Sequence, residues 1–326
     1  MVSLCSSVLA SLVIALSSLV LALASRASAQ WGPSSLDEAD VQRSVRDVQI
    51  TAWVEMPFYA GHTSQPLGAD LVSFSPSIGL RGRFVELVAV ELEIPFALGS
   101  YDLDDGGQST DFRTGNPTVS VFATPRLYED RDLRLEFHGG AGVALPGANQ
   151  HRPEPLLDAD EIRQSAASVY NLGLAIGSRG VWSPWRYYPE HWGLFATAGL
   201  ELFVRGGLYF ASELATAGFF ATRDGLFGED GRDGSGGQLS IEGGVEPLDW
   251  IRISLWLAGF GFFDDGIENN DDFQLAMEPR LTLASGGFFA QLGFLLNLDE
   301  PFGIGGEDDD QYPGVWSVRV VVGGRT

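Results

Sequence analysis

One hairpin, residues 271 to 297, restricts the fold of this chain more than any other stretch. The apolar face of its first arm consists of Phe273, Leu275, Met277, Leu281 and Leu283. Most side chains between them are polar, and this alternation with a period of two is typical of a strand. After a tight turn at 285–287 the second arm repeats the pattern. Each arm has roughly 10 to 13 residues, enough for a tilted strand to cross the ~25 Å apolar band of a membrane barrel.

The same alternation recurs from residue 47 onward. The segments that show it are 47–58, 70–82, 84–97, 115–127, 132–146, 191–204, 206–219, 236–248, 249–263, 271–285, 286–298 and 313–323. Their short connections are 81–83, 128–131, 204–207, 246–250 and 285–287, and these alternate with long ones at 59–69, 98–114, 147–190, 220–235, 264–270 and 299–312. Short connections on one side and long ones on the other are typical of outer-membrane barrels, so the sequence predicts about twelve antiparallel strands.

The acidic side chains follow the same division. The chain has 43 Asp and Glu against 20 basic residues, all of them Arg, and about half of the acids fall in the long connections. The alternative is a soluble sandwich or lipocalin-like barrel. In such a fold nothing would place the long acidic loops at one end of the sheet and the short turns at the other. We therefore predict an all-β fold, a single transmembrane up-and-down β-barrel over residues 47–326 with short periplasmic turns and long acidic extracellular loops. The net charge of -23 argues against nucleic acid as a partner. The expected partner is outer-membrane lipid, which the apolar face of the strands would contact.

The N-terminal residues differ from the rest of the chain. An apolar run over 4–24 is followed at 27–29 by Ala-Ser-Ala, the small-residue pattern of a signal peptidase site. Residues 1–29 are thus predicted to be a cleaved secretion signal, with a membrane anchor as the alternative. Residues 30–46 are predicted to be a periplasmic leader, either disordered or with a short helix that starts at a capping box.

Segment 158–180 fits two interpretations. Its apolar residues have helical spacing from Ile162 to Ile176, yet those from Tyr170 to Ile176 also alternate as in a strand. A thirteenth strand there would invert every later connection and place the acidic loops inside. We therefore predict a helix within the long connection 147–190, and we expect this connection to fold into the barrel mouth.

With these strands in place, the chain resembles the Gram-negative outer-membrane β-barrels of the porin-like range, with about twelve strands. The resemblance covers residues 47 to 323, and the sequences ELEIPF at 91–96 and GNPT at 115–118 look like recurrent pieces of aromatic-compound-channel-like barrels. It implies a location in the outer membrane and insertion by the barrel-assembly machinery. Such barrels commonly end on an aromatic residue, whereas here the last strand is followed by Gly-Gly-Arg-Thr at 323–326.

The polar side chains of the predicted strands would share one lumen. The charged residues among them are Glu55, Glu91, Glu93, Arg126, Arg134, Glu136, Glu201, Glu213, Glu242, Arg252, Glu278, Arg280 and Arg319, together with Arg81 and Glu246. Barrels of about eight strands fill their interior and those of about sixteen leave an aqueous channel, so about twelve strands are compatible with both. Unpaired carboxylates would favour cations or polar neutral solutes in a narrow pore, whereas Arg–Glu pairs would form a closed ladder.

Catalytic residues, metal sites and cofactors are not expected. Serine lies beside none of the four histidines, and the motifs G-x-S-x-G and H-E-x-x-H do not occur. The only cysteine, Cys5, falls within the predicted signal. Acidic clusters such as those at 102–106 and 307–310 lack the spacing of an EF-hand loop, so we expect solvated loops, with Ca²⁺ binding as the alternative.

These features predict passive diffusion of a small solute through a Glu/Arg-lined lumen, gated by the connection 147–190. The alternative is a closed barrel, structural or binding a ligand or partner, without transport. Under the first hypothesis, replacing Glu91 or Glu278 by Gln would change the selectivity between cations and anions. The sequence leaves the solute and the oligomeric state open.

Overall fold

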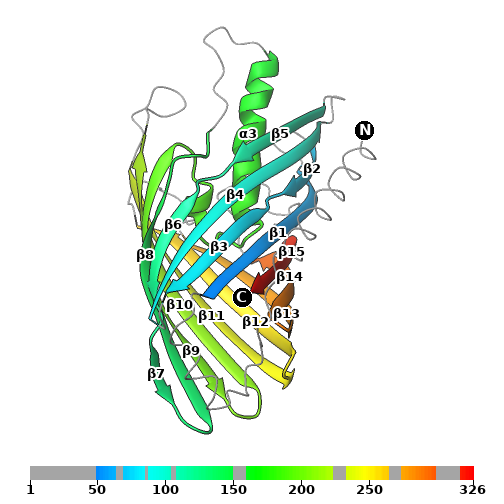
Figure 1. Cartoon of the computed structure of the whole chain (residues 1–326). Coiled ribbons are helices and arrows are strands. Elements are labelled where there is room, and N and C mark those ends of the chain that lie inside the picture. Colours follow the sequence, from blue (N-terminus) through cyan, green and yellow to red (C-terminus); the bar gives the residue numbers. More distant parts are fainter. Residues whose placement is uncertain are drawn as a thin grey trace.

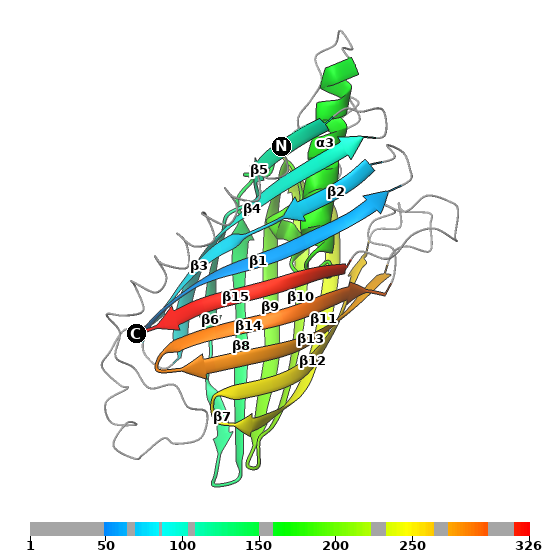
Figure 2. The same ribbon diagram turned by 90° about the vertical axis from the view of Figure 1, so that its right-hand side faces the viewer.

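The computed structural model describes residues 49–63, 69–84, 87–103, 108–149, 159–222, 233–263, 273–298 and 316–326. The predicted signal, the leader and most of the acidic loop residues lie outside these ranges. The strands are β1 (Gln49–Thr63), β2 (Ala69–Phe74), β3 (Ser77–Phe84), β4 (Val88–Leu103), β5 (Gln108–Thr114), β6 (Thr118–Ala123), β7 (Arg126–Glu129), β8 (Leu133–Ala144), β9 (His191–Val204), β10 (Leu208–Ala221), β11 (Gly234–Leu248), β12 (Ile251–Phe262), β13 (Phe273–Ser285), β14 (Phe288–Asn297) and β15 (Trp316–Arg325). They form one antiparallel sheet that closes where β15 pairs with β1 (Figures 1 and 2).

The fifteen strand segments make up twelve wall strands, as the sequence predicts. β2 and β3 are two halves of one strand, because both lie between β1 and β4 and are separated only by Ser75 and Pro76. β5, β6 and β7 follow one another in the same way, with breaks that contain Pro117 and Pro125. Proline has no N–H to donate to a ladder, which favours a break at these positions, although Pro57 and Pro95 lie within the unbroken strands β1 and β4.

One parity of each strand carries the apolar surface that the alternation predicts. Large exposed side chains of this kind include Leu80, Leu92, Leu194, Leu214, Leu239, Leu255, Leu281 and Leu292. They follow one another around the barrel from β3 to β14. So much uncovered apolar area is unfavourable in water, at about 25 cal/mol per Å², so this face is the one that lipid covers.

The predicted helix is present as α3 (Ala159–Gly177), and a 3-10 turn, η1 (Pro184–Arg186), follows it. We call residues 159–190 the plug. No helix in the described part of the chain is long and apolar enough to cross a membrane. α3 enters at the end of the barrel that carries the long connections, beside β2, β4 and β5 (Figures 1 and 2). Its Leu172, Leu174 and Ile176 are buried against inward side chains of the wall, among them Tyr59 and Tyr101.

The wall next to α3 is taller than the sequence predicts. Residues 98–114 were expected to be a loop, but β4 continues to Leu103 and β5 occupies 108–114. This extension packs against α3, where buried Asn171 donates hydrogen bonds to the carbonyl of Ala97 (3.2 Å) and to Asp111 Oδ2 (2.9 Å). Only the inner face of this part of the sheet packs against α3, with Tyr101 among the buried side chains, while Thr110, Phe112 and Thr114 on the other face are exposed. Apolar side chains are therefore not confined to the outer face, and the alternation that marks the other strands is lost.

Candidate functional site

The plug is attached to the wall at the strand breaks. At the break between β5 and β6, Asn116 Nδ2 donates to the carbonyls of Trp185 (2.9 Å) and Tyr188 (2.7 Å), and the Asn116 N–H donates to that of Arg186 (2.6 Å). A Cβ on the adjacent Gly115 would lie 2.5 Å from the same Arg186 oxygen, so only glycine permits this approach. Backbone groups that make no hydrogen bond to a neighbouring strand at this break thus bond to the plug instead.

The second break contacts the plug in the same way. Arg179 Nη1 donates to Ser75 Oγ at 3.1 Å. The Tyr187 hydroxyl donates to the carbonyls of Ser75 (3.4 Å) and Phe96 (3.3 Å), and burial raises the pKa of Tyr187 above its ordinary value. The guanidinium of Arg179 lies over the Tyr187 ring, 5.0 Å from its centroid.

Two arginines of the plug reach carboxylates of the wall. Arg186 Nη2 lies 2.7 Å from Glu93 Oε2, and its Nη1 lies 3.6 Å from Glu55. Arg179 Nε is also 3.6 Å from Glu55. The side chains of Glu93 and Arg179 are almost fully buried, at 1% and 2% exposure. Water therefore screens these ion pairs little.

The pairing continues along the wall. Fully buried Glu278 accepts from Arg280 Nε (2.7 Å) and Arg319 Nε (2.8 Å). Arg319 also reaches Glu55 (3.2 Å), and Arg280 reaches Glu242 (2.6 Å). One network of alternating charges thus joins β1, β11, β13 and β15 across the interior.

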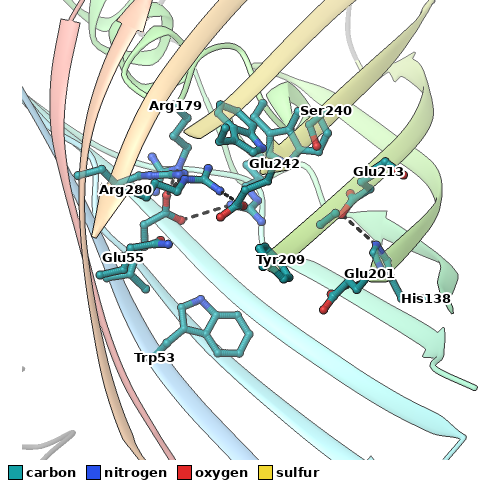
Figure 3. A pocket seen from close by; sticks show the side chains of 18 residues that line it. Trp53, Glu55, His138, Arg179, Glu201, Tyr209, Glu213, Ser240, Glu242 and Arg280 are labelled. Carbon is teal, nitrogen blue, oxygen red and sulfur yellow. Dashed lines mark hydrogen bonds and ion pairs between the residues drawn. The ribbon is translucent and has the colours of Figure 1, made fainter. Parts of the chain in front are cut away.

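Beside this network lies a cavity of about 340 Å³ (Figure 3). Its lining comes from the plug, from β1 and from each strand between β8 and β15, so it lies inside the barrel. The lining residues that carry charge or can acquire it in water are Glu55, His138, Arg179, Arg186, Glu201, Glu213, Glu242, Arg280 and Arg319, with Tyr209 beside them.

On the wall opposite Glu55 and Arg280, His138 lies between two glutamates (Figure 3). Its Nε2 is 3.3 Å from Glu213 Oε2, and its Nδ1 is 3.8 Å from Glu201 Oε1. Among the described residues, no arginine lies within ion-pair distance of Glu201 or Glu213. A Cβ at Gly199 would lie 2.3 Å from the imidazole, so glycine makes room for His138.

The structure divides the thirteen residues predicted to line the lumen into three groups. The first group belongs to the network and consists of Glu55, Glu93, Glu242, Glu278, Arg280 and Arg319. The second group lies nearer the short turns: Glu91 pairs with Arg81, Arg134 with Glu136 and Arg252 with Glu246, and Arg126 lies there too. The third group, Glu201 and Glu213, flanks His138. Arg126 lies on β7, which pairs with β8 alone and is exposed throughout, so it is at the rim rather than in the closed part of the barrel.

Sequence reasoning gave Arg179, Arg186, Asn116 and His138 no role in the interior, although it noted GNPT at 115–118 and considered the four histidines for catalysis. The two arginines fall in a connection without strand alternation, so parity could not assign them to the interior. A signal existed nonetheless: both lie within a few residues of aromatic side chains, inside the longest connection of the chain. No group of three or more His, Cys, Asp or Glu side chains that could hold a metal ion occurs within the ranges that the structure describes.

Comparison with known proteins adds evidence on the fold. No family model matches the sequence, and no curated protein sequence does. An outer membrane channel from Pseudomonas putida F1 has a similar structure, with a TM-score of 0.56 and 9% identity over 90% of this chain and 100% of the other. The NanC porin is more distant, with a TM-score of 0.44 and 6% identity over 86% of this chain and all of that one. The closed antiparallel sheet, its apolar outer face and the likeness to the Pseudomonas putida channel together show that the chain has the fold of the Gram-negative outer-membrane β-barrels.

Proposed function

We propose that this barrel is an outer-membrane channel for a small solute and that the structure represents its closed state. The observation that carries the proposal is the charged internal cavity, part of whose lining, Arg179, Trp182 and Arg186, is supplied by the plug. A barrel with a purely structural role could fill its interior with side chains of the wall. Here a separate segment does so, through contacts that can be broken without disturbing a strand.

In the open state the plug would leave the lumen, and solute would diffuse past the charged wall. The wall suits this role because Glu93 and Glu55 become accessible to water when Arg179 and Arg186 leave with the plug, whereas Glu278 keeps its wall partners Arg280 and Arg319. Most lumenal carboxylates pair with arginine, and Glu201 and Glu213 do not. Open-channel selectivity should therefore depend on these two side chains, and on Glu93 once Arg186 has left with the plug, rather than on Glu91 or Glu278.

A variant without the plug tests the proposal. The backbone N–H of Glu190 donates to the carbonyl of Ala148 (2.8 Å), so the two ends of the connection lie side by side. Residues 150–188 can thus be replaced by a short Gly/Ser linker without displacing β8 or β9. We expect rare, brief openings of the parent protein in planar lipid bilayers and steady conductance steps from this variant.

Replacement of residues 223–232, another long connection, by the same linker is the matched control and should leave the conductance of the parent unchanged. A sealed bilayer with the plugless variant at every voltage would reject the channel. The closed barrel that binds a ligand or partner would then be the better account.

A further inference from the structure

Among the described residues that line the cavity, His138 is the only histidine. Histidine is the one side-chain type whose ordinary pKa lies between about pH 5 and about pH 8. Glutamate and arginine ordinarily change their charge well outside that range. His138 is therefore the position at which the charge of the lumen can change near neutral pH.

Two carboxylates without an arginine partner among the described residues flank His138. Glu213 on β10 lies 3.3 Å from its Nε2, and Glu201 on β9 lies 3.8 Å from its Nδ1. β6, which also pairs with β8, has no charged side chain between Thr118 and Ala123. The neutral phenol of Tyr209 on β10 lines the same cavity.

Further charges on this side of the wall form balanced ion pairs. They are Arg134 with Glu136, Arg81 with Glu91, Arg252 with Glu246 and, at the rim, Arg126 with Glu129. Glu201 and Glu213 thus leave an excess of two negative charges beside a neutral imidazole and of one beside a protonated imidazole.

The three side chains lie where a permeating ion would meet them. His138 is 20% exposed, Glu201 36% and Glu213 32%, and all three line the cavity, so water, protons and small ions can reach them. They belong to the wall, so they stay in place when the plug leaves.

We propose that His138 is a specificity-determining residue of the lumen. Protonation of its imidazole halves the excess negative charge at Glu201 and Glu213, so the open channel prefers cations more strongly at alkaline pH than in mild acid. This inference rests on the proposed function, because it states which ions the open channel would pass.

The permeability ratio of K⁺ to Cl⁻ tests the inference. Reversal potentials are measured in a gradient of potassium chloride across bilayers that hold many copies of the full-length protein, so that rare openings add up to a steady current. Where the full-length protein passes no current, the same measurement is made on the plugless variant, which keeps all three side chains. From about pH 8 to about pH 5 the ratio should fall roughly two- to fivefold, the effect of one unit charge a few Å from an ion in water.

Two substitutions fix the charge of this position. His138→Gln should keep the high ratio of the parent protein at both pH values, and His138→Lys should keep the low ratio at both. His191→Gln is the matched control, because His191 lies on the wall at the long-connection end, with its Nδ1 2.6 Å from the carbonyl of Pro189. It should leave the pH dependence unchanged.

A ratio that does not change with pH in the parent protein would overturn the inference and retain the channel. A pH dependence that survives in His138→Gln would also overturn it, because the glutamates themselves would then be the titrating groups. Absence of current from both the full-length protein and the plugless variant would reject the channel and, with it, the inference.

Discussion

Replacing Arg186 by Gln should open the channel. Arg186 Nη2 lies 2.7 Å from Glu93, whose side chain is 1% exposed and has no other ion-pair partner among the described residues. Loss of one member of a buried ion pair costs about 3–5 kcal/mol, because the remaining charge stays desolvated. That cost falls on the closed state alone, since departure of the plug hydrates Glu93. At about 1.4 kcal/mol per tenfold, the ratio of closed to open channels should fall by roughly two to three and a half orders of magnitude.

The assay is the open probability of single channels in planar bilayers at fixed voltage. The double variant Glu93→Gln/Arg186→Gln is the control, because it removes the same arginine and leaves a neutral amide in place of the buried carboxylate. A buried neutral amide costs far less than a buried charge, so the double variant should regain much of the closure.

Equal open probability in Arg186→Gln and the parent protein would refute the reasoning, because the pair would then not hold the plug. An open probability in the double variant as high as in Arg186→Gln would show instead that the guanidinium acts through contacts other than Glu93, such as its approach to Glu55.

Three further substitutions test the contacts described above. In Gly293→Ala the new Cβ would lie 1.9 Å from Glu278 Oε1, so the free energy of unfolding, measured in urea, should fall by about 1–3 kcal/mol. Gly243→Ala is the control, because a Cβ there has nothing within 4 Å and should change the free energy of unfolding little. Equal effects of the two substitutions would contradict this account. Burial raises the pKa of Tyr187, so the closed state should be most stable below the ordinary phenol pKa of about 10 and lose stability as pH rises beyond it. The open probability of the parent protein should therefore rise at alkaline pH, and Tyr187→Phe should abolish this rise. Asn116→Ala should speed tryptic cleavage within the plug, and an unchanged rate would show that its hydrogen bonds are dispensable.

The alternation of side chains predicts the wall because lipid imposes it on every strand that it touches. The same rule fails where the inner neighbour is a helix rather than the lumen. The extensions of β4 and β5, at 98–103 and 108–114, pack Gly99 and Tyr101 toward α3 and expose Thr110 and Thr114 on the other face, so their sequence reads as a loop. Parity also assigns Glu55 and Arg319 to the interior, but it does not show that they meet, since 264 residues separate them and their contact depends on closure of the barrel.

Two properties of the plug reduce the net stability of its attachment to the wall. Buried ion pairs stabilise a fold less than apolar packing of the same volume, so the charged side of the interface contributes little net stability while keeping the wall wettable after release. Val181 and Ser183 adopt left-handed backbone conformations, with φ of 57° and 56°. Such a conformation costs about 1–2 kcal/mol per residue, and it is most unusual for a β-branched side chain such as Val181. In the proposed gating, release of the plug would relieve this strain, and we therefore predict that disruption of a single buried pair shifts the balance toward the open channel.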